Sequence, residues 1–546
     1  MARAVFLAAC SAAAFAQADP SYACNFLTAP EVSCMLFVTP RLLLRAGSRR
    51  QQRGGVAVTV PPLPSSPRPS RARPFPDNFF LRDGHLEFSN SSLPIDDGGG
   101  EIDPDAGGWN ALRGFSPLGP VLAYLPSLNL DLSGLPRLWN ISASNSSGAS
   151  ANSVLLDLAS GEALAHWVEL DHSGDSGGTA LYERVLTLWP AARLADAREY
   201  VVAFRRLVDD DGLRVQPSDG MAALLSGAPT GNAALEAARP RFARIFAALA
   251  KAGWAQADLT LAWSFTTNTQ EDITARFLHM RDDAFARIAA AGDINYTITS
   301  IANNVDVNTS RRIKGTFAVP CYLPFDAIPA LNSRLVLDAA GLPVYQNDVH
   351  FDFEVVIPTS VAANGKPVKV VQYGHGLFGD HGEVEEGYLS AQGNAYGYVL
   401  AATDWIGLSE YDAPTVAVML ATSFSNFAIV PDRLHQGMLN ALVLMKLMTQ
   451  SSFARDPAVT YGGASVISTD PADRHYTGNS QGGIMGAVYL SASTDVTRAV
   501  IGVGGGPYAL LLPRSTDFAQ LFDVLRLRYP RSVDRMCAIA LIQALW

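Results

Sequence analysis

The sequence predicts a mixed α/β protein in two folded parts. Residues 310–546 are expected to form a mostly parallel sheet with helices on both faces, and residues 74–309 a β-rich, sandwich-like domain with helical insertions. Three observations predict this class. The 546 residues are 48% hydrophobic and 17% charged, a balance that can bury large cores. Short apolar runs between turn residues fill the first part, and strand-like and helix-like segments alternate in the second.

Residues 1–18 have the composition of a secretory signal peptide. Arg3 supplies a positive charge, and the apolar stretch Ala4–Ala16 is too short to span a bilayer. Ala16 and Ala18 flank one residue, as at a small-x-small cleavage site. The chain is therefore expected to be secreted; a disordered Ala-rich start is the alternative.

Residues 19–73 are expected to form a leader that carries a disordered Arg/Pro-rich segment. Its part 39–73 holds eight arginines and no acidic residue, so it cannot form a packed core. We interpret it as a linker or as sequence absent from the mature protein, with a basic arm for an anionic surface as the alternative. The net charge of −10 argues against nucleic-acid binding. No other apolar stretch approaches the ~20 residues that a membrane-spanning helix needs.

Cysteines and glycosylation motifs fit an exported protein. Four cysteines would remain after cleavage: Cys24, Cys34, Cys321 and Cys537. Export favours disulfides, but four cysteines allow three connectivities, and the sequence does not choose among them. Buried free thiols are the alternative, and the lack of a Cys-x-x-Cys pair disfavours zinc. Five Asn-x-Ser/Thr triplets predict surface positions for N-glycans at Asn90, Asn140, Asn145, Asn295 and Asn308.

In the first part, short runs rich in β-formers predict five strands, over 153–158, 164–170, 184–189, 200–207 and 259–266. Apolar residues at helical spacing predict helices over 240–252 and 272–290. In the second part the predicted strands are 368–373, 398–403, 474–477 and 499–503. The helices predicted between them are 383–392, 431–448 and 482–490. This alternation implies a mostly parallel sheet.

The motif Gly478–Gly482, with the pattern Gly-x-Ser-x-Gly, lies between a predicted strand and a predicted helix. In such a nucleophile elbow the turn is so tight that the serine adopts a strained backbone conformation, and glycines two residues away on each side relieve the crowding. The turn presents the hydroxyl above the sheet at a helix N-terminus. Ser480 is therefore predicted to be a catalytic nucleophile, and an ordinary Gly-rich turn is the alternative.

A second glycine-rich motif, from Gly374 through His375 and Gly376 to Asp380, directly follows the strand predicted over 368–373. A loop at this position supplies one backbone N–H of an oxyanion hole, and the residue after the nucleophile supplies the other. We assign these donors to Leu377 and Gln481, with His375 orienting the loop. A Gly-rich turn with a solvent-bound histidine, or a metal site formed by His375, Asp380 and His381, is the alternative.

Residues Tyr373–Gly379 together with Gly478–Gly483 resemble secreted microbial lipases and esterases of the α/β-hydrolase fold. The chain is similar in particular to large bacterial-type extracellular (virulence-factor) lipases with a β-rich N-terminal domain, and Pro74–Phe79 resembles the start of that domain. The resemblance implies hydrolysis of a small-molecule or lipid ester through an acyl-enzyme, without a cofactor or metal.

The sequence departs from this family in one respect. The family's acid and histidine follow the nucleophile in the chain, but no histidine follows Ser480, and the last one is His475. The hydrolase domain 310–546 is therefore expected to be truncated, with its acid and histidine outside this sequence. His435 and His475 are interpreted as structural. The alternative is a catalytically inactive secreted glycoprotein that uses the hydrolase scaffold for binding.

Overall fold

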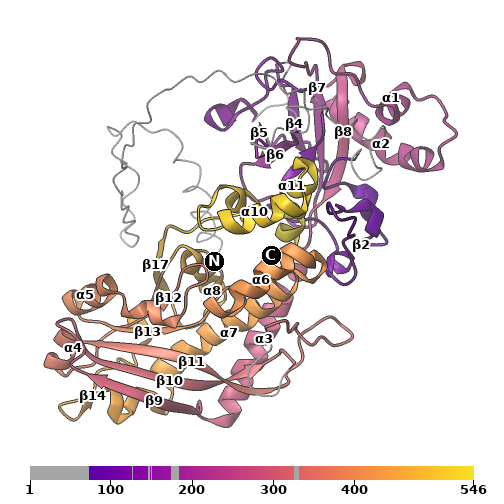
Figure 1. Ribbon diagram of the computed structural model, residues 1–546. Helices are drawn as coiled ribbons and strands as arrows, with labels where there is room; N and C mark the ends of the chain where they lie inside the picture. The colour runs from indigo at the N-terminus through magenta and orange to yellow at the C-terminus, as the bar shows by residue number, and fades with distance from the viewer. Residues whose placement is uncertain (1–72, 126, 145–147, 149, 174–183, 325–330) are drawn as a thin grey trace, which may run out of the picture.

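The computed structural model describes residues 73–546 except 126, 145–147, 149, 174–183 and 325–330. The expected signal peptide, almost all of the leader, Cys24, Cys34 and Asn145 lie outside the described residues. Figure 1 shows a β-rich N-terminal lobe and a larger α/β lobe, with helices α10 and α11 between them.

The N-terminal lobe contains two antiparallel sheets of three strands each. One has the order β3 (Val121–Ala123), β6 (Leu186–Pro190), β5 (His166–Leu170), and the other β4 (Ser153–Asp157), β7 (Glu199–Arg205), β8 (Leu259–Thr266). Alternate residues of β4 and β7 face opposite sides, as the two-residue period of a strand requires. One side joins the main core, and the other packs against helices α1 (Asp219–Ser226) and α2 (Ala233–Lys251).

Two helices in this chain differ from their predicted bounds. Helix α2 begins at Ala233 and not at Pro240, because the side chain of Asn232 accepts two backbone N–H groups of the first turn and caps the helix there. Pro240 therefore lies inside α2. The helix predicted over 383–392 is a 3-10 turn, His381–Glu385, followed by α5, Gly387–Tyr396.

The α/β lobe is built on a sheet of seven strands, five of which run in one direction. Their order is β17 (Arg498–Gly502), β16 (Arg474–Asn479), β12 (Val370–Gly374), β13 (Val399–Thr403), β11 (Asn347–Pro358), β10 (Thr309–Cys321) and β9 (Tyr296–Asn303). Strands β17, β16, β12 and β13 are mutually parallel, and β11, β10 and β9 are joined by antiparallel pairing. Strand β9 lies upstream of residue 310 and still belongs to this sheet.

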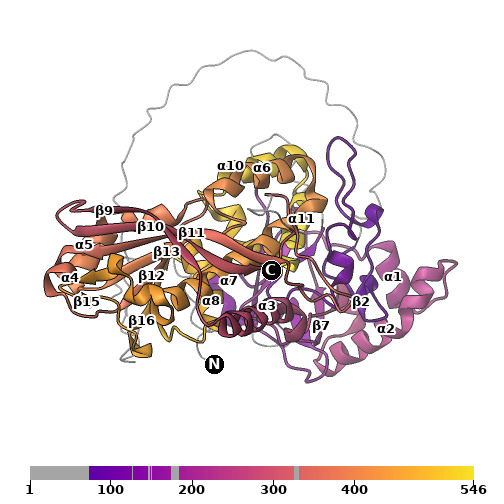
Figure 2. The same ribbon diagram turned by 90° about the horizontal axis from the view of Figure 1, so that it is seen from below.

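Helices cover both faces of the sheet, as the alternation predicts. On one face Val371, Tyr373 and Leu400 pack against Leu389 of α5. The other face packs against α7 (Ile429–Gln450) and α8 (Gln481–Ala492), and Gln372 donates to the Ala441 carbonyl oxygen of α7. Figure 2 shows α3 (Gln270–Ala291), α7 and α8 close together beside the sheet. The predicted mixed α/β fold with a mostly parallel core sheet is confirmed.

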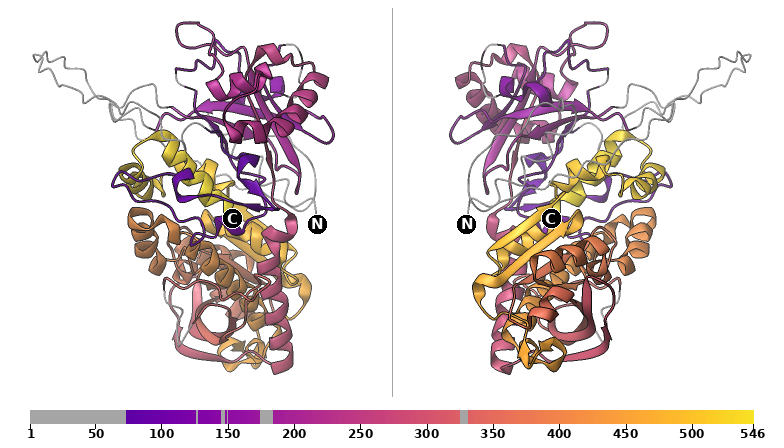
Figure 3. Two further views of the ribbon diagram at one scale, coloured as in Figure 1. Left: turned by 90° about the vertical axis from the view of Figure 1, so that its right-hand side faces the viewer. Right: turned by 90° about the vertical axis from the view of Figure 1, so that its left-hand side faces the viewer.

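The remaining helices of the α/β lobe are short. They are α4 (Thr359–Asn364), α6 (Ala413–Thr422), α9 (Tyr508–Leu511), α10 (Ala519–Arg528) and α11 (Ser532–Ala544). Figure 3 shows α10 and α11 between the two lobes from both sides. There, Trp109 of the N-terminal lobe donates to the carbonyl oxygen of Leu541 at 2.9 Å, and Met536 packs with Leu122 and Val185. The two lobes therefore share one continuous hydrophobic core.

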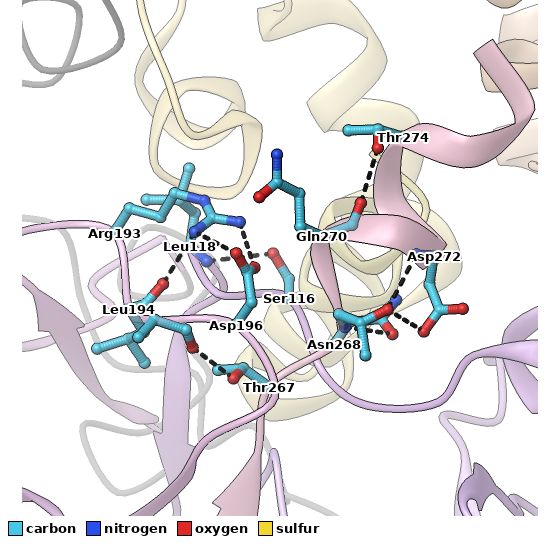
Figure 4. Close-up of polar contacts among 12 residues, drawn as sticks. Ser116, Leu118, Arg193, Leu194, Asp196, Thr267, Asn268, Gln270, Asp272 and Thr274 are labelled. Carbon is cyan, nitrogen blue, oxygen red and sulfur yellow. Dashed lines mark hydrogen bonds and ion pairs between the residues drawn. The ribbon is translucent and has the colours of Figure 1, made fainter. Parts of the chain in front are cut away.

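A polar turn joins β8 to α3 (Figure 4). The hydroxyl oxygen of Thr269 accepts the N–H of Asp272 at 3.0 Å, which caps the helix, and the Thr269 hydroxyl donates to the Asp272 carboxylate at 2.6 Å. Thr267 donates to the carbonyl oxygen of Ala195 within the N-terminal lobe. Further along α3, Arg281 donates to the carbonyl oxygen of Ala492. Helix α3 thus connects the N-terminal lobe to the helices that support the large sheet.

The described surface bears on the expected modifications. Asn90, Asn140 and Asn295 are exposed, whereas Asn308 is half-buried and accepts a hydrogen bond from Asn394. Within the described ranges, the two cysteines Cys321 and Cys537 are free thiols. None of the described helices combines the length and the apolarity needed to cross a membrane.

Candidate active site

Ser480 occupies the turn between β16 and α8 at the carboxyl edge of the sheet. Its backbone angles are φ 55° and ψ −117°, outside the regions that side-chain-bearing residues normally adopt. Its N–H donates to the carbonyl oxygen of Gly502 at 3.0 Å, which fixes the turn against β17. The residue is half-buried. Such strain, of order 1–3 kcal/mol, is retained where the surrounding structure imposes it, and it is frequent at functional sites.

The glycines around Ser480 are required by close backbone contacts. A Cβ atom at Gly478 would lie 2.5 Å from the carbonyl oxygen of Gly482, so a larger residue would force the turn open. A Cβ atom at Gly482 would lie 2.0 Å from the carbonyl oxygen of Gly374 and 3.0 Å from that of His375. Gly374 is also the register partner of Gly478 in the parallel pair β12–β16. The two motifs predicted from the sequence therefore lie directly against each other.

The peptide group between Gly376 and Leu377 has a fixed orientation. Its carbonyl oxygen accepts the Nδ1–H of His375 at 2.8 Å and the N–H of Gly379 at 3.1 Å, both within the loop. Because a trans peptide points its N–H opposite to its C=O, the N–H of Leu377 points away from the interior of the loop.

The neighbouring N–H groups of this loop are already bonded. The N–H of Gly376 donates to the Glu383 carboxylate, and that of Phe378 donates to the carbonyl oxygen of Leu408 at 3.0 Å. Within the described part of the chain, the N–H of Leu377 has no hydrogen-bond acceptor. It is therefore available to a ligand placed beside Gly482.

Gln481 is the first residue of α8, so its N–H lies at the helix N-terminus, where backbone N–H groups lack intrahelical partners. The positive end of the helix dipole favours negative charge there. The side chain of Gln481 is buried and exchanges two hydrogen bonds with the hydroxyl of Tyr508, at 2.7 and 3.0 Å. These bonds hold the Gln481 side chain against α9, and the backbone N–H of Gln481 is the group that can bind an oxyanion.

His375 is fully buried, and both ring nitrogens are bonded to the backbone. Its Nε2 accepts the N–H of Trp405 at 2.8 Å, so Nε2 carries no proton, and Nδ1 donates to the carbonyl oxygen of Gly376. Burial lowers the pKa of His375 and favours this neutral form. The geometry agrees with the predicted role of orienting the loop and leaves the ring no free nitrogen for proton transfer.

The neutral state of His375 predicts an acid-sensitive fold. The unfolded chain binds a proton on this histidine below its ordinary pKa of about 6.5, whereas the native chain resists protonation, so falling pH favours unfolding. The contribution is present above about pH 6.5 and is lost below it. Denaturant unfolding above and below this pH should show a larger loss of stability for the wild type than for His375→Asn. An equal loss in both proteins would contradict the assignment.

His435 and His475 form no hydrogen bond with the Ser480 hydroxyl. His475 lies at the start of β16, and four residues of extended strand place it more than about 13 Å away. His435 is half-buried in α7, with its ring 5.9 Å from that of Phe277. Among the described residues, no side chain forms a hydrogen bond with the Ser480 hydroxyl.

Three groups near the site were not predicted from the sequence. Glu383 binds the loop through the N–H of Gly376, and Asn479 forms a hydrogen bond with Tyr388. His381 donates through its N–H to Asp404 at 2.6 Å, and its Nδ1 lies 2.8 Å from the same oxygen. Burial acts to lower the pKa of His381, but the contact with Asp404 outweighs it and raises the pKa. The only sequence signal for the last pair was the position of Asp404 directly after an apolar strand.

The strand order, the helices on both faces and the turn at Ser480 together define an α/β-hydrolase-type fold. The described residues contain no cluster of three or more His, Cys, Asp or Glu side chains that could hold a metal ion.

No protein-family model and no curated protein matches the sequence. Similar solved structures include acetyl xylan esterase 1 from Thermoanaerobacterium sp., with a TM-score of 0.30, 13% identity, and coverage of 50% of this chain and 73% of that chain. S-formylglutathione hydrolase from Staphylococcus aureus has a TM-score of 0.18, 14% identity, and coverage of 39% and 70%. A carboxylesterase from Geobacillus stearothermophilus has a TM-score of 0.17, 18% identity, and coverage of 30% and 31%.

Proposed function

We propose that this protein is a serine hydrolase that cleaves carboxylic esters, with Ser480 as the nucleophile. One observation carries the proposal: a serine in a strained strand-to-helix turn lies beside a loop whose Leu377 N–H is turned outward and lacks an acceptor among the described residues. A serine hydroxyl and two convergent N–H groups are the parts that acyl transfer requires.

The reaction proceeds in two steps. Ser480 Oγ gives its proton to a base from solution and forms a bond to the acyl carbon as the carbonyl π electrons move onto oxygen. The N–H groups of Leu377 and Gln481 stabilise that oxyanion. The oxyanion then collapses, the bond to the leaving alcohol breaks, and the alcohol departs with the proton that Ser480 gave up. Water hydrolyses the acyl-enzyme by the same route. Each oxyanion donor is expected to contribute about 3 kcal/mol of transition-state stabilisation.

Proton transfer is expected to limit the rate of ester hydrolysis by this protein. A serine hydroxyl is a weak nucleophile without a base, and no described histidine forms a hydrogen bond with Ser480. We therefore predict slow hydrolysis of p-nitrophenyl acetate and slow labelling of Ser480 by a fluorophosphonate probe. Added imidazole should accelerate both, because it can fill the role of the missing base, whereas imidazole should not accelerate hydrolysis by Ser480→Ala beyond the rate in buffer.

The absence of a bonded base also favours a second candidate function, a non-catalytic secreted glycoprotein that binds ligands on the hydrolase scaffold. Folded protein that shows neither Ser480 labelling nor imidazole-dependent hydrolysis would support this binding role and contradict the enzymatic one. We propose that the substrate is a small-molecule or lipid ester. Nucleic acid is not proposed as a partner, because the chain is acidic.

We further propose that the protein is exported and glycosylated. The support is the sequence of residues 1–18 and the exposure of Asn90, Asn140 and Asn295. Expression in a eukaryotic secretory host should give protein in the medium that begins at Asp19 and loses mass on treatment with an N-glycosidase. Retention of Met1 inside the cells would contradict export.

A further inference from the structure

A chain of hydrogen bonds runs from the residue before Ser480 to the neighbouring loop. The side-chain amide of Asn479 donates to the Tyr388 hydroxyl oxygen at 3.0 Å. The hydroxyl oxygens of Tyr388 and Tyr373 are 3.3 Å apart, and the Tyr373 hydroxyl donates to Glu383 Oε2 at 3.1 Å. Since the Tyr373 proton goes to the carboxylate, the Tyr388 hydroxyl is the donor between the two tyrosines.

Glu383 ends this chain on the loop itself. The N–H of Gly376 points at both carboxylate oxygens, at 3.0 Å from Oε2 and 3.2 Å from Oε1. The carboxylate also fits closely over the loop, because a Cβ atom at Gly379 would lie 1.9 Å from Oε1. An ionised carboxylate only accepts hydrogen bonds, so every donor in the chain points toward Glu383.

The other end of the chain is held equally firmly. A Cβ atom at Gly502 would lie 2.0 Å from Oδ1 of Asn479, so the amide packs against the backbone of β17. Tyr373, in the middle, is 3% exposed. These hydrogen bonds therefore join the turn that carries Ser480 to the loop that carries Leu377 through the buried Tyr373 and the exposed Tyr388.

We propose that Glu383 is a positioning residue that, through Tyr373, Tyr388 and Asn479, holds the Leu377 N–H at the correct distance from Ser480. This inference rests on the proposed function. Glu383 touches neither the nucleophile nor the oxyanion. It fixes the peptide group between His375 and Gly376 through the Gly376 N–H, while the side chain of His375 and the N–H of Gly379 fix the next peptide group through the Gly376 carbonyl oxygen. Misplacement of a catalytic group by about 1 Å costs about 100-fold in rate, so the carboxylate has a large effect without contacting substrate.

The test is the kinetics of fluorophosphonate labelling in imidazole buffer. Glu383→Gln replaces one acceptor oxygen by an N–H₂ donor that faces the N–H of Gly376 or the hydroxyl of Tyr373. We expect the maximal labelling rate to fall about 10- to 100-fold, with the half-saturating probe concentration and the thermal midpoint little changed. Tyr388→Phe, which breaks the link to Asn479 at a half-exposed residue, should lower the same rate by about 3- to 10-fold.

Glu386→Gln is the matched control, since Glu386 is exposed and its side chain does not cap α5; it should label at the wild-type rate. Combining Glu383→Gln with Tyr388→Phe should lower the labelling rate no more than Glu383→Gln alone, because both act through one series of hydrogen bonds. A folded Glu383→Gln variant that labels at the wild-type rate would overturn the inference and leave the proposed function standing. Wild-type protein that fails to label at Ser480 would overturn the proposed function, and this inference with it.

Discussion

Replacement of Ser480 by alanine is expected to abolish covalent labelling by a fluorophosphonate, a fall of at least about 100-fold, together with imidazole-dependent ester hydrolysis. Both observables need the Ser480 oxygen, because the labelled atom and the attacking atom are the same. The strained backbone conformation is retained with alanine, so the fold should persist. Intact-mass spectrometry after labelling, with circular dichroism to check folding, measures the result.

Ser480→Gly is the matched variant for the backbone. Glycine adopts φ 55° without strain, so this variant should be more stable than the wild type by about 1 kcal/mol while it also fails to label. Labelling that persists in either variant would place the reactive group elsewhere and contradict the assignment.

Replacement of Gly482 by alanine is expected to lower the rate of Ser480 labelling by about 100-fold and to destabilise the protein by about 3 kcal/mol. The new methyl group would lie 2.0 Å from the carbonyl oxygen of Gly374. The contact is with backbone, so it cannot be relieved by a side-chain rotation. The elbow and the oxyanion loop must therefore separate. Labelling kinetics and denaturant unfolding measure the two effects.

Gly387→Ala provides the control for this substitution within the same lobe. Gly387 begins α5, has no heavy atom within 4 Å of a Cβ position, and lacks a positive φ. Alanine should therefore be neutral or slightly stabilising there, because it favours the helix. If Gly482→Ala changes the labelling rate and the stability no more than Gly387→Ala does, the close contact between the two motifs is contradicted.

The elements predicted correctly share a strong local pattern. Strands β4, β7, β8, β12 and β13 consist mainly of apolar or β-branched residues, and α7 has apolar residues at helical spacing on several turns. The turn at Ser480 was predicted from its Gly-x-Ser-x-Gly pattern, and the loop from Gly374 was predicted from its position directly after an apolar strand. In each case, residues close in sequence carry the information.

Other elements depend on partners that are distant in sequence. Strands β9 to β11 were not predicted, because β9 is largely exposed and the charged residues of β10 and β11 obscure the alternation. Glu354 of β11 is fully buried, and Lys314 and Arg312 of β10 lie within 3.2 and 3.4 Å of its carboxylate.

The same reason explains why Glu383 was missed at the site. Its neighbours in the sequence suggest an ordinary helix start, and its role follows only from the folded position of Gly376. The proton acceptor for Ser480 was not identified in this sequence, and no described side chain forms a hydrogen bond with the Ser480 hydroxyl.

The most direct test of the account is the crystal structure of the protein labelled by a fluorophosphonate. We predict phosphorus bonded to Ser480 Oγ, with the phosphoryl oxygen about 2.7–3.1 Å from the backbone nitrogens of both Leu377 and Gln481. A phosphoryl oxygen that points into solvent, or an adduct on another residue, would contradict it.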